Sequence, residues 1–251
     1  AGDPMAMAFL HMAKTPGVAL LSWVTTTPAN NSKGTYMALT MLIQAVREVA
    51  LTLNYGVLLA ATNDHALRKL FIRSGFIPSD GAMTHLWSDI AAMERPHVLG
   101  PGIRTIDLQG KEADMHPLFM GWWKSHGWPG VSLAMLPPTG LLAERNDGQA
   151  EAVAWIYFDN SSPLAMIEWA CSNPANTPKQ SYAAVCRLVQ AARSLAAAEG
   201  CKAILTSAQQ PALVRIFERH HFTVTESDVS HLVMVTGLDK VGSNKAGGPT
   251  A

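Results

Sequence analysis

The chain contains an internal repeat, and this repeat constrains the fold more than any other feature of the sequence. When the chain is shifted by 146 positions, residues 5–88 align with residues 151–234 without a gap, and about 23 positions are identical. Chance would produce a few identities but not this many in one register. The identical positions include Trp23 with Trp169 and His85 with His231. We therefore predict that one structural unit occurs twice.

The second copy follows a leader segment, residues 104–150, that the first copy lacks. Between the copies, residues 94–103 (ERPHVLGPGI) hold two prolines and two glycines, a composition that is typical of a linker. These features predict four regions: a truncated half-domain over 5–90, a linker over 91–103, a complete domain over 104–238 and a flexible tail over 239–251.

Each copy is predicted to run strand–strand–helix–strand–helix–strand–strand. In the second copy, β-branched and aromatic residues predict strands over Ala150–Phe158 and Pro163–Cys171. Thr177 and Pro178 suit the N-cap and first position of a helix. The apolar stripe of this helix begins at Tyr182, as that of the first copy begins at Tyr36, so both rings are expected to face the sheet. The alternative is that each ring lies at the start of its helix, where it would block an anion.

Two further strands are predicted at the end of the second copy, over Phe222–Thr225 and Ser230–Val235. The leader adds the strands Arg104–Leu108 and Thr139–Arg145 with a helical region between them. The predicted fold class is α/β (α+β), with helices flanking the mixed sheets of an internal duplication.

The composition excludes several classes of protein. The hydrophobic fraction of 48% supports a sizeable core, and 19 basic against 19 acidic residues argue against tight nucleic-acid binding. The three cysteines follow no metal-ligand spacing, so we expect free thiols in a reducing cytoplasm and no metal. No apolar stretch reaches the ~18–20 residues of a membrane span. The apolar run Met5–Met12 lacks the features of a signal peptide.

The second copy with its leader resembles the GNAT superfamily of N-acetyltransferases over Arg104–Val235. The family's strand-to-helix motif, V-x-P-x-x-R-G-x-G-x-G/A, is matched in spacing by C-S-N-P-A-N-T-P-K-Q-S-Y at Cys171–Tyr182 and by T-T-T-P-A-N-N-S-K-G-T-Y at Thr25–Tyr36. Its later L-Y-x-x-x-G-F motif is matched at Leu70–Phe76 and Ile216–Phe222. The first copy matches the family order only from the third strand. The chain is also similar to small phage-encoded members, which implies the host cytoplasm if it is viral.

Both copies depart from the family motifs at positions that carry chemistry. The family's arginine and first glycine are absent, and tyrosine replaces its final small residue at positions 36 and 182. Phe71 and Phe217 stand where the family often has a general-acid tyrosine. The resemblance therefore predicts the fold more strongly than the catalytic chemistry.

The resemblance implies acetyl-CoA as donor, bound where the fourth and fifth strands of the second copy separate. The pantetheine arm would hydrogen-bond the backbone at Ala170 and Ser172. Its pyrophosphate would meet the helix N-terminus. The residues implied there are Thr177, Lys179, Gln180 and Ser181. The alternative is an ordinary capped helix with a solvated lysine.

Glu168 is the best candidate for a general base, because it interrupts an otherwise apolar strand where an unpaired carboxylate is costly. The first copy has Ser22 there, so we expect only the second copy to open and work. The alternative is a glutamate at a sheet edge or on a solvent face. His231 is a candidate proton shuttle or a structural histidine. Ser207 is a candidate substrate contact or a helix N-cap.

Aromatic residues gather in the leader at Trp122, Trp123 and Trp128. In the family this region lines the acceptor site, so these rings are candidate substrate contacts; the alternative is packing on the core. Cys171 has no fixed cation evident beside it, so we expect a passive thiol.

These observations predict an acyl-CoA-dependent N-acyltransferase, with acetyl as the default group, that acts by direct transfer in the second copy. The acceptor would be a small-molecule or nucleobase amine, and a homodimer is left open. One alternative is a non-catalytic GNAT-like binding or assembly module. Another is an acyltransferase that uses a donor other than CoA.

Overall fold

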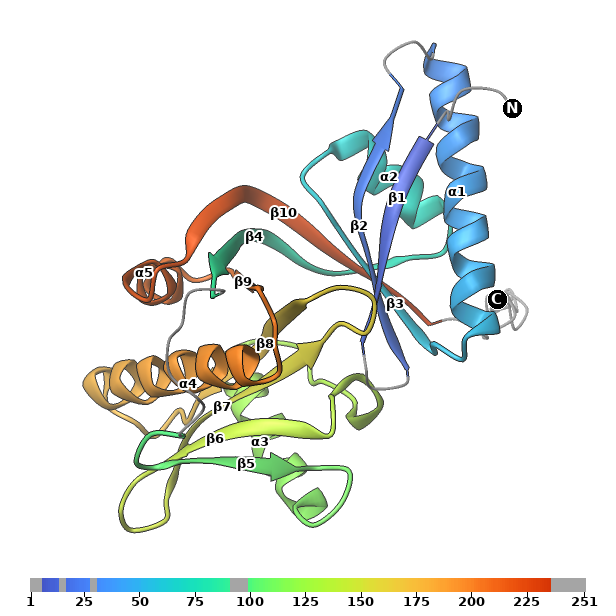
Figure 1. Ribbon diagram of the computed structural model, residues 1–251. Coiled ribbons are helices and arrows are strands. Elements are labelled where there is room, and N and C mark those ends of the chain that lie inside the picture. The colour runs from blue at the N-terminus through green and yellow to red at the C-terminus, as the bar shows by residue number, and fades with distance from the viewer. Residues whose placement is uncertain (1–5, 14–16, 28–30, 91–98, 236–251) are drawn as a thin grey trace, which may run out of the picture.

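The computed structural model describes residues 6–13, 17–27, 31–90 and 99–235, and ten strands of this part of the chain form one mixed sheet flanked by helices (Figure 1). The predicted tail and most of the predicted linker lie outside these residues. The order of strands is β1-β2-β3-β10-β4-β9-β8-β7-β6-β5.

The elements follow the two copies and the leader along the chain. The first copy forms β1 (Ala6–Met12), β2 (Val18–Thr26), α1 (Ser32–Thr52), β3 (Val57–Thr62), α2 (His65–Arg73) and β4 (Ile77–Asp89). The leader forms β5 (Ile103–Asp107), η1 (Ala113–Met115), α3 (His116–Ser125), η2 (Leu133–Met135) and β6 (Thr139–Glu144). The second copy forms β7 (Ala150–Phe158), β8 (Leu164–Ser172), α4 (Pro178–Ala198), β9 (Ala203–Ala208), α5 (Pro211–Arg219) and β10 (Thr223–Val235).

The end of each copy differs from the prediction. Phe222–Thr225 and Ser230–Val235 were expected as separate strands, but the second copy ends in the single strand β10, as the first ends in β4. Ala82 and Asp228, which are equivalent in the repeat, have φ of 54° and 57°. These left-handed residues accompany register shifts between β4 and β10, so the chain bulges and continues instead of turning back.

The two copies exchange their last strands. β4 of the first copy pairs with β9 of the second, with Thr84 opposite Ala208, while β10 of the second copy pairs with β3 of the first, with Ser230 opposite Thr62. β4 and β10 also pair with each other, and Figure 1 shows them side by side between the two halves of the molecule. Each copy's sheet is therefore completed by the other copy, and the two predicted domains share one sheet.

Buried side chains form three clusters around this sheet. In the second copy, Val185 and Leu188 of α4 pack on one face, while Phe119 and Trp123 of α3 pack on the other. In the first copy, α1 packs its buried side chains, including Ile43, against β2 and β3. These clusters determine which face of the sheet each helix covers.

The prediction that the two helix-start tyrosines face the sheet is wrong. Tyr36 is 47% exposed and Tyr182 is 41% exposed. Each lies in the first turns of a long helix, and the buried stripes begin later, at Ala38 and Ala184. The Tyr182 hydroxyl instead accepts a hydrogen bond from Nη1 of Arg219 on α5, at 2.8 Å.

A polar cluster at the carboxyl end of β1 connects the two copies through hydrogen bonds. Nδ1 of His11 lies 2.8 Å from Oδ2 of Asp159, in the turn after β7, and the Met12 N–H donates to the same carboxylate. The Asn160 side chain donates to the Tyr55 hydroxyl. Among the helices of the described residues, none combines the length and apolar character that crossing a membrane requires.

Strand exchange predicts which residues a disulfide can join. We expect Thr84→Cys with Ala208→Cys to form an intrachain disulfide on mild oxidation, because these residues are register partners between β4 and β9. Thr84→Cys with Thr62→Cys is the matched control, since residue 62 would be the partner of residue 84 if each copy kept its own last strand. Mass spectrometry of peptides from the oxidised protein measures the outcome. A bond in the control pair and none in the first pair would contradict the exchange.

Candidate active site

The two parallel strands of the second copy separate at their carboxyl ends. β8 and β9 pair from Leu164 with Ala203 to Ile167 with Thr206, and β8 then continues to Ser172 without pairing to β9. At this point Trp169 has a φ of 59° and the register between β7 and β8 shifts. The bulge turns β8 away from β9, which produces the predicted opening between the strands.

The first copy opens in the same way, and the expectation that only the second copy opens is therefore wrong. β2 and β3 pair from Val18 with Val57 to Leu21 with Ala60, while β2 continues to Thr26. The pairing stops at equivalent positions of the repeat. The sheet of the first copy is therefore open although Ser22 stands where the second copy has Glu168.

Both openings lead into one cavity of about 880 Å³. On the second-copy side, it is lined by Trp123 and Trp128 from the leader and also by Leu213 of α5. Trp123 belongs to the core around α3 and Leu213 packs with the core around α4, so the cavity reaches both faces of the sheet. A volume of this size suits a ligand or ligand pair of ordinary cofactor dimensions.

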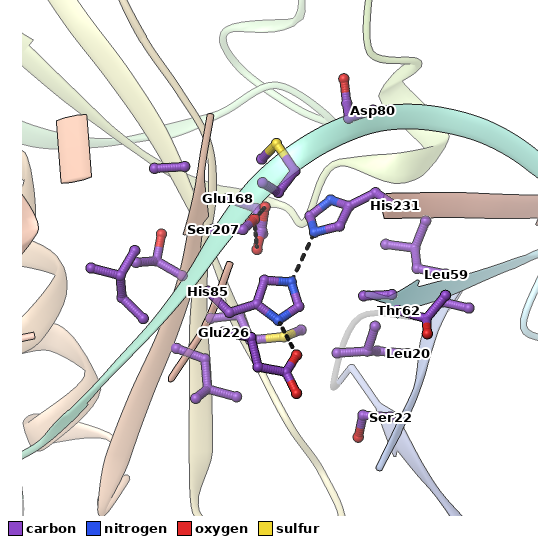
Figure 2. A pocket seen from close by; sticks show the side chains of 18 of the residues that line it. Leu20, Ser22, Leu59, Thr62, Asp80, His85, Glu168, Ser207, Glu226 and His231 are labelled. Atoms are coloured by element: carbon purple, nitrogen blue, oxygen red, sulfur yellow. Dashed lines mark hydrogen bonds and ion pairs between the residues drawn. The ribbon is translucent and has the colours of Figure 1, made fainter. Parts of the chain in front are cut away.

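Glu168 and Ser207, two of the predicted site residues, meet at the point where β8 and β9 separate (Figure 2). The Ser207 hydroxyl lies 3.2 Å from each oxygen of the Glu168 carboxylate, to which it donates. Glu168 lines the cavity, and its strand β8 pairs with both β7 and β9, so the alternative of a sheet-edge or solvent-face glutamate is wrong. The N-cap of α5 is Gln210, so Ser207 does not cap that helix.

The environment of Glu168 changes its acidity. The pKa of Glu168 is raised to about 8: burial raises it most, the hydrogen bond from Ser207 lowers it, and the negative charge of Asp80 adds to the rise. A carboxyl group with this pKa changes protonation state near neutral pH, which is what a general base requires.

The strand exchange brings His85 of the first copy into this site. His85 lies opposite Ser207 in the β4–β9 register and opposite Glu226 in the β4–β10 register. Its Nε2 lies 3.0 Å from Nε2 of His231, and its Nδ1 lies 3.6 Å from Oε2 of Glu226. Figure 2 shows these side chains as a chain of contacts from Glu226 through His85 to His231, beside the Glu168–Ser207 pair.

The two histidines cannot both donate at their shared contact, because one nitrogen must offer a lone pair. Burial lowers the pKa of His231 to about 4, with a further contribution from His85, and burial also lowers the pKa of His85. His231 is therefore neutral at pH 7. Sequence reasoning singled out His231 but not His85, because the signal for His85 is the exchange, which lies outside either copy.

The predicted phosphate site at the start of α4 is largely occupied by helix capping. The Thr177 hydroxyl accepts from the Gln180 N–H, the Gln180 side chain accepts from the Thr177 N–H, and the Ser181 N–H donates to the Thr177 carbonyl. Among the contacts of the described chain, the Lys179 N–H has no acceptor. An anion there would thus meet one backbone donor and the Lys179 side chain. Tyr182 follows one turn later on α4, and its ring and hydroxyl contact Arg219 of α5.

The leader holds the free end of β8. Nε2 of His126 lies 2.9 Å from the Ser172 carbonyl oxygen, and Nε1 of Trp123 donates to the Trp169 carbonyl at 3.3 Å. The Ser172 carbonyl is therefore already paired, whereas Ala170 lines the cavity. The roles of Ala170 and Ser172 in holding a pantetheine arm stay predictions.

The leader tryptophans divide into two groups. Trp122 is 4% exposed and packs against Phe119, so it serves the core. Trp123 and Trp128 line the cavity, although Trp123 also packs against Trp155. Burial raises the pKa of Cys171 to about 12, which agrees with a passive thiol. In the described part of the chain, no three His, Cys, Asp or Glu residues are grouped to hold a metal ion.

We compared the sequence and the structure with those of known proteins. No family model and no curated protein matches the sequence. The chain is similar to the structure of a protein from Novosphingobium aromaticivorans assigned to the GNAT acetyltransferases, with 16% identity, a TM-score of 0.50, and coverage of 89% of this chain and 85% of that one. The chain has the GNAT fold.

Two further structures are similar over most of the chain. A GCN5-related N-acetyltransferase from Sphaerobacter thermophilus has 11% identity and a TM-score of 0.47, and covers 91% of this chain and 76% of its own. A tandem GNAT protein from the clavulanic acid biosynthesis pathway has 11% identity and a TM-score of 0.48, and covers 94% and 80%. Identities this low concern the fold alone, so the function rests on the geometry of the site.

The raised pKa of Glu168 predicts a pH-dependent stability. The native state keeps a proton that the unfolded state loses between pH 4.5 and about 8, so stability falls as pH rises through this window. Glu168→Gln lacks this titration. From about pH 5 to about pH 8, we expect the variant to gain on the order of a few kcal/mol relative to the original chain, measured by urea unfolding. Glu218→Gln, an exposed change on α5, is the control; equal pH dependence in Glu168→Gln and the original chain would contradict the burial of this carboxyl group.

Proposed function

We propose that this protein is an acyl-CoA-dependent N-acyltransferase, with acetyl-CoA as the default donor and the active site at the opening of the second copy. The observation that carries the proposal is the Glu168–Ser207 pair at the point where β8 and β9 separate, with the pKa of Glu168 near 8. Ser22 stands at the equivalent position of the first copy, which has no base there.

In the proposed reaction, the amine nitrogen of the acceptor attacks the thioester carbonyl carbon. The C–N bond forms and the C–S bond breaks, and one proton passes from nitrogen to the departing thiolate. Glu168 takes this proton from the amine and returns it toward the sulfur, while Ser207 holds the carboxylate in place. A base near pKa 8 balances being ionised against being basic enough to accept the proton.

The donor would enter through the opening with its phosphates outside the cavity, at the start of α4. Lys179 supplies one free N–H and an ammonium group, and Arg219 supplies a guanidinium group near the Tyr182 ring. These cations would take the place of the arginine and first glycine of the family motif, which this chain lacks. The capping box at Thr177 and Gln180 fixes the helix end in either case.

The rival is a non-catalytic binding module, which the missing motif residues favour. A donor other than acyl-CoA is the other alternative, since the capping hydrogen bonds leave few free N–H groups for a pyrophosphate. All three hypotheses are compatible with the same fold, so measurements of ligand binding distinguish between them more directly than the structure does.

Donor binding can be measured by calorimetry and by the melting temperature. We expect acetyl-CoA to stabilise the protein, by about 2.7 kcal/mol at 100 times its Kd. Lys179→Ala should weaken this binding roughly tenfold, because a charge-assisted contact to phosphate is lost. Lys33→Ala removes the equivalent lysine of the first copy and should leave donor affinity unchanged. Absence of acetyl-CoA binding to the original chain would favour the binding module or another donor.

Catalysis can be separated from binding at Glu168. Glu168→Gln should lower kcat roughly 100-fold or more while the Kd for acetyl-CoA stays within about twofold, because the change removes a base but little volume. In the original chain, the rate should rise with pH up to about 8, as Glu168 ionises, and this limb should disappear in the variant. Steady-state kinetics across pH measures both. An unchanged kcat with the limb intact would remove Glu168 from the mechanism.

A further inference from the structure

The two openings face each other across the shared cavity. On one side, β2 continues past its last pair with β3, and its residues Ser22 and Val24 line the cavity; on the other, Glu168 and Ala170 of β8 occupy the equivalent positions. The His85–His231 pair lies between them, with Ser22 and Thr62 on the first-copy side in Figure 2. A ligand held in each opening would therefore direct its inner end toward the same pair of histidines.

The two openings differ in chemistry at equivalent positions. The second copy has the Glu168 carboxylate where the first has Ser22, and it has neutral Gln210 where the first has Asp64. Both members of each pair line the cavity. The first-copy opening therefore lacks the base, and it has a negative charge at the N-cap of α2 that would repel the phosphates of a CoA donor.

The charges around the cavity have one sign. Its lining includes four carboxyl groups and neither lysine nor arginine among the described residues; the four are Asp64, Asp80, Glu168 and Glu226. Because the pKa of Glu168 lies near 8, the negative charge of the lining at pH 7 comes from the other three carboxyl groups. Cavities lined by one sign of charge concentrate ligands of the opposite sign. Between the carboxyl groups, apolar side chains such as Leu20, Leu59 and Met83 form the wall, which suits a hydrocarbon chain.

The first-copy opening also has unused hydrogen-bonding capacity. The Ser22 Oγ is buried and has no hydrogen-bond partner in the described structure. Leaving a buried hydroxyl unpaired costs about 1–3 kcal/mol, and a polar ligand in the opening would recover part of this cost. The backbone of β2 beyond Leu21 has likewise lost its neighbour β3, so an extended ligand can hydrogen-bond there.

We propose that the first-copy opening is the binding site of the acceptor, and that this acceptor is a cationic amine carried on an apolar chain. The proposal rests on the proposed acyl transfer: the donor lies in the second-copy opening and the acceptor lies in the first. The acceptor first releases its ammonium proton to solvent, and the neutral amine then meets the thioester beside Glu168. The duplication thus supplies two ligand sites of opposite charge preference. The described lining residues include no fixed cation, which disfavours phosphorylated acceptors, nucleotides included.

The repeat provides matched variants for a test. Val24→Trp fills the first-copy opening, and Ala170→Trp fills the equivalent place in the second. We expect Val24→Trp to weaken binding of hexane-1,6-diamine at least tenfold and to leave acetyl-CoA binding within twofold, and Ala170→Trp to show the reverse, in calorimetry on the full chain. Loss of diamine binding in Ala170→Trp together with its retention in Val24→Trp would overturn the proposal.

A milder variant tests the charge preference without filling the cavity. Asp80→Asn should weaken diamine binding about tenfold, and 6-aminohexanoate should bind the original chain at least tenfold more weakly than the diamine, because its carboxylate meets the acidic lining. Equal binding of the two probes, or no diamine binding to a chain that binds acetyl-CoA, would overturn this inference and leave the acyl transfer standing. Failure of acetyl-CoA itself to bind would instead remove the proposed function on which it rests.

Discussion

Main-chain hydrogen bonds of β4 and β10 hold the two copies in one sheet, and the site depends on them. If each copy kept its own last strand, Ser207 would face the histidine of its own copy and the two sheets would be free to separate. The exchange instead places His85 opposite Ser207 and His231 opposite Ala61, which are equivalent positions. The two histidines meet because they are related by the repeat and lie on neighbouring strands that run antiparallel.

The same arrangement explains the electrostatics of the cavity. Two parallel strands that separate leave polar backbone and side chains exposed to a space that the rest of the sheet encloses. Glu168 lies in this space with one hydroxyl partner, so its carboxyl group loses hydration without gaining a cation, and its pKa rises. His231 loses hydration and faces another imidazole, so its pKa falls. Both shifts favour neutral forms at the centre of the molecule, where the proposed reaction needs an uncharged amine.

The sequence predicts local structure well here, because the same pattern of strands and helices can be recognised independently in each of the two copies. The bounds of β7 agree with the prediction, α4 begins at Pro178, and Glu168 was identified from an apolar strand that it interrupts. The exchange could not be predicted, because β4 and β10 are equivalent in the sequence repeat and each can pair with the same neighbours. Tyr182 was misplaced because periodicity gives the face of a helix but not where the sheet beneath it ends. His85 was not identified as a site residue because its position in the site depends on the strand exchange.

The two copies differ in their side chains at equivalent positions but share the same backbone features. Both openings persist and equivalent bulges persist at Ala82 and Asp228, whereas position 22 or 168 and position 64 or 210 have changed their charge. If the first copy only completed the sheet, nothing would favour keeping its strands apart, since closing them would add main-chain hydrogen bonds and pair the Ser22 hydroxyl or bury it less. An opening that costs stability, with a serine in place of Glu168 and a carboxylate in place of Gln210, is more consistent with a second ligand site than with a purely structural role.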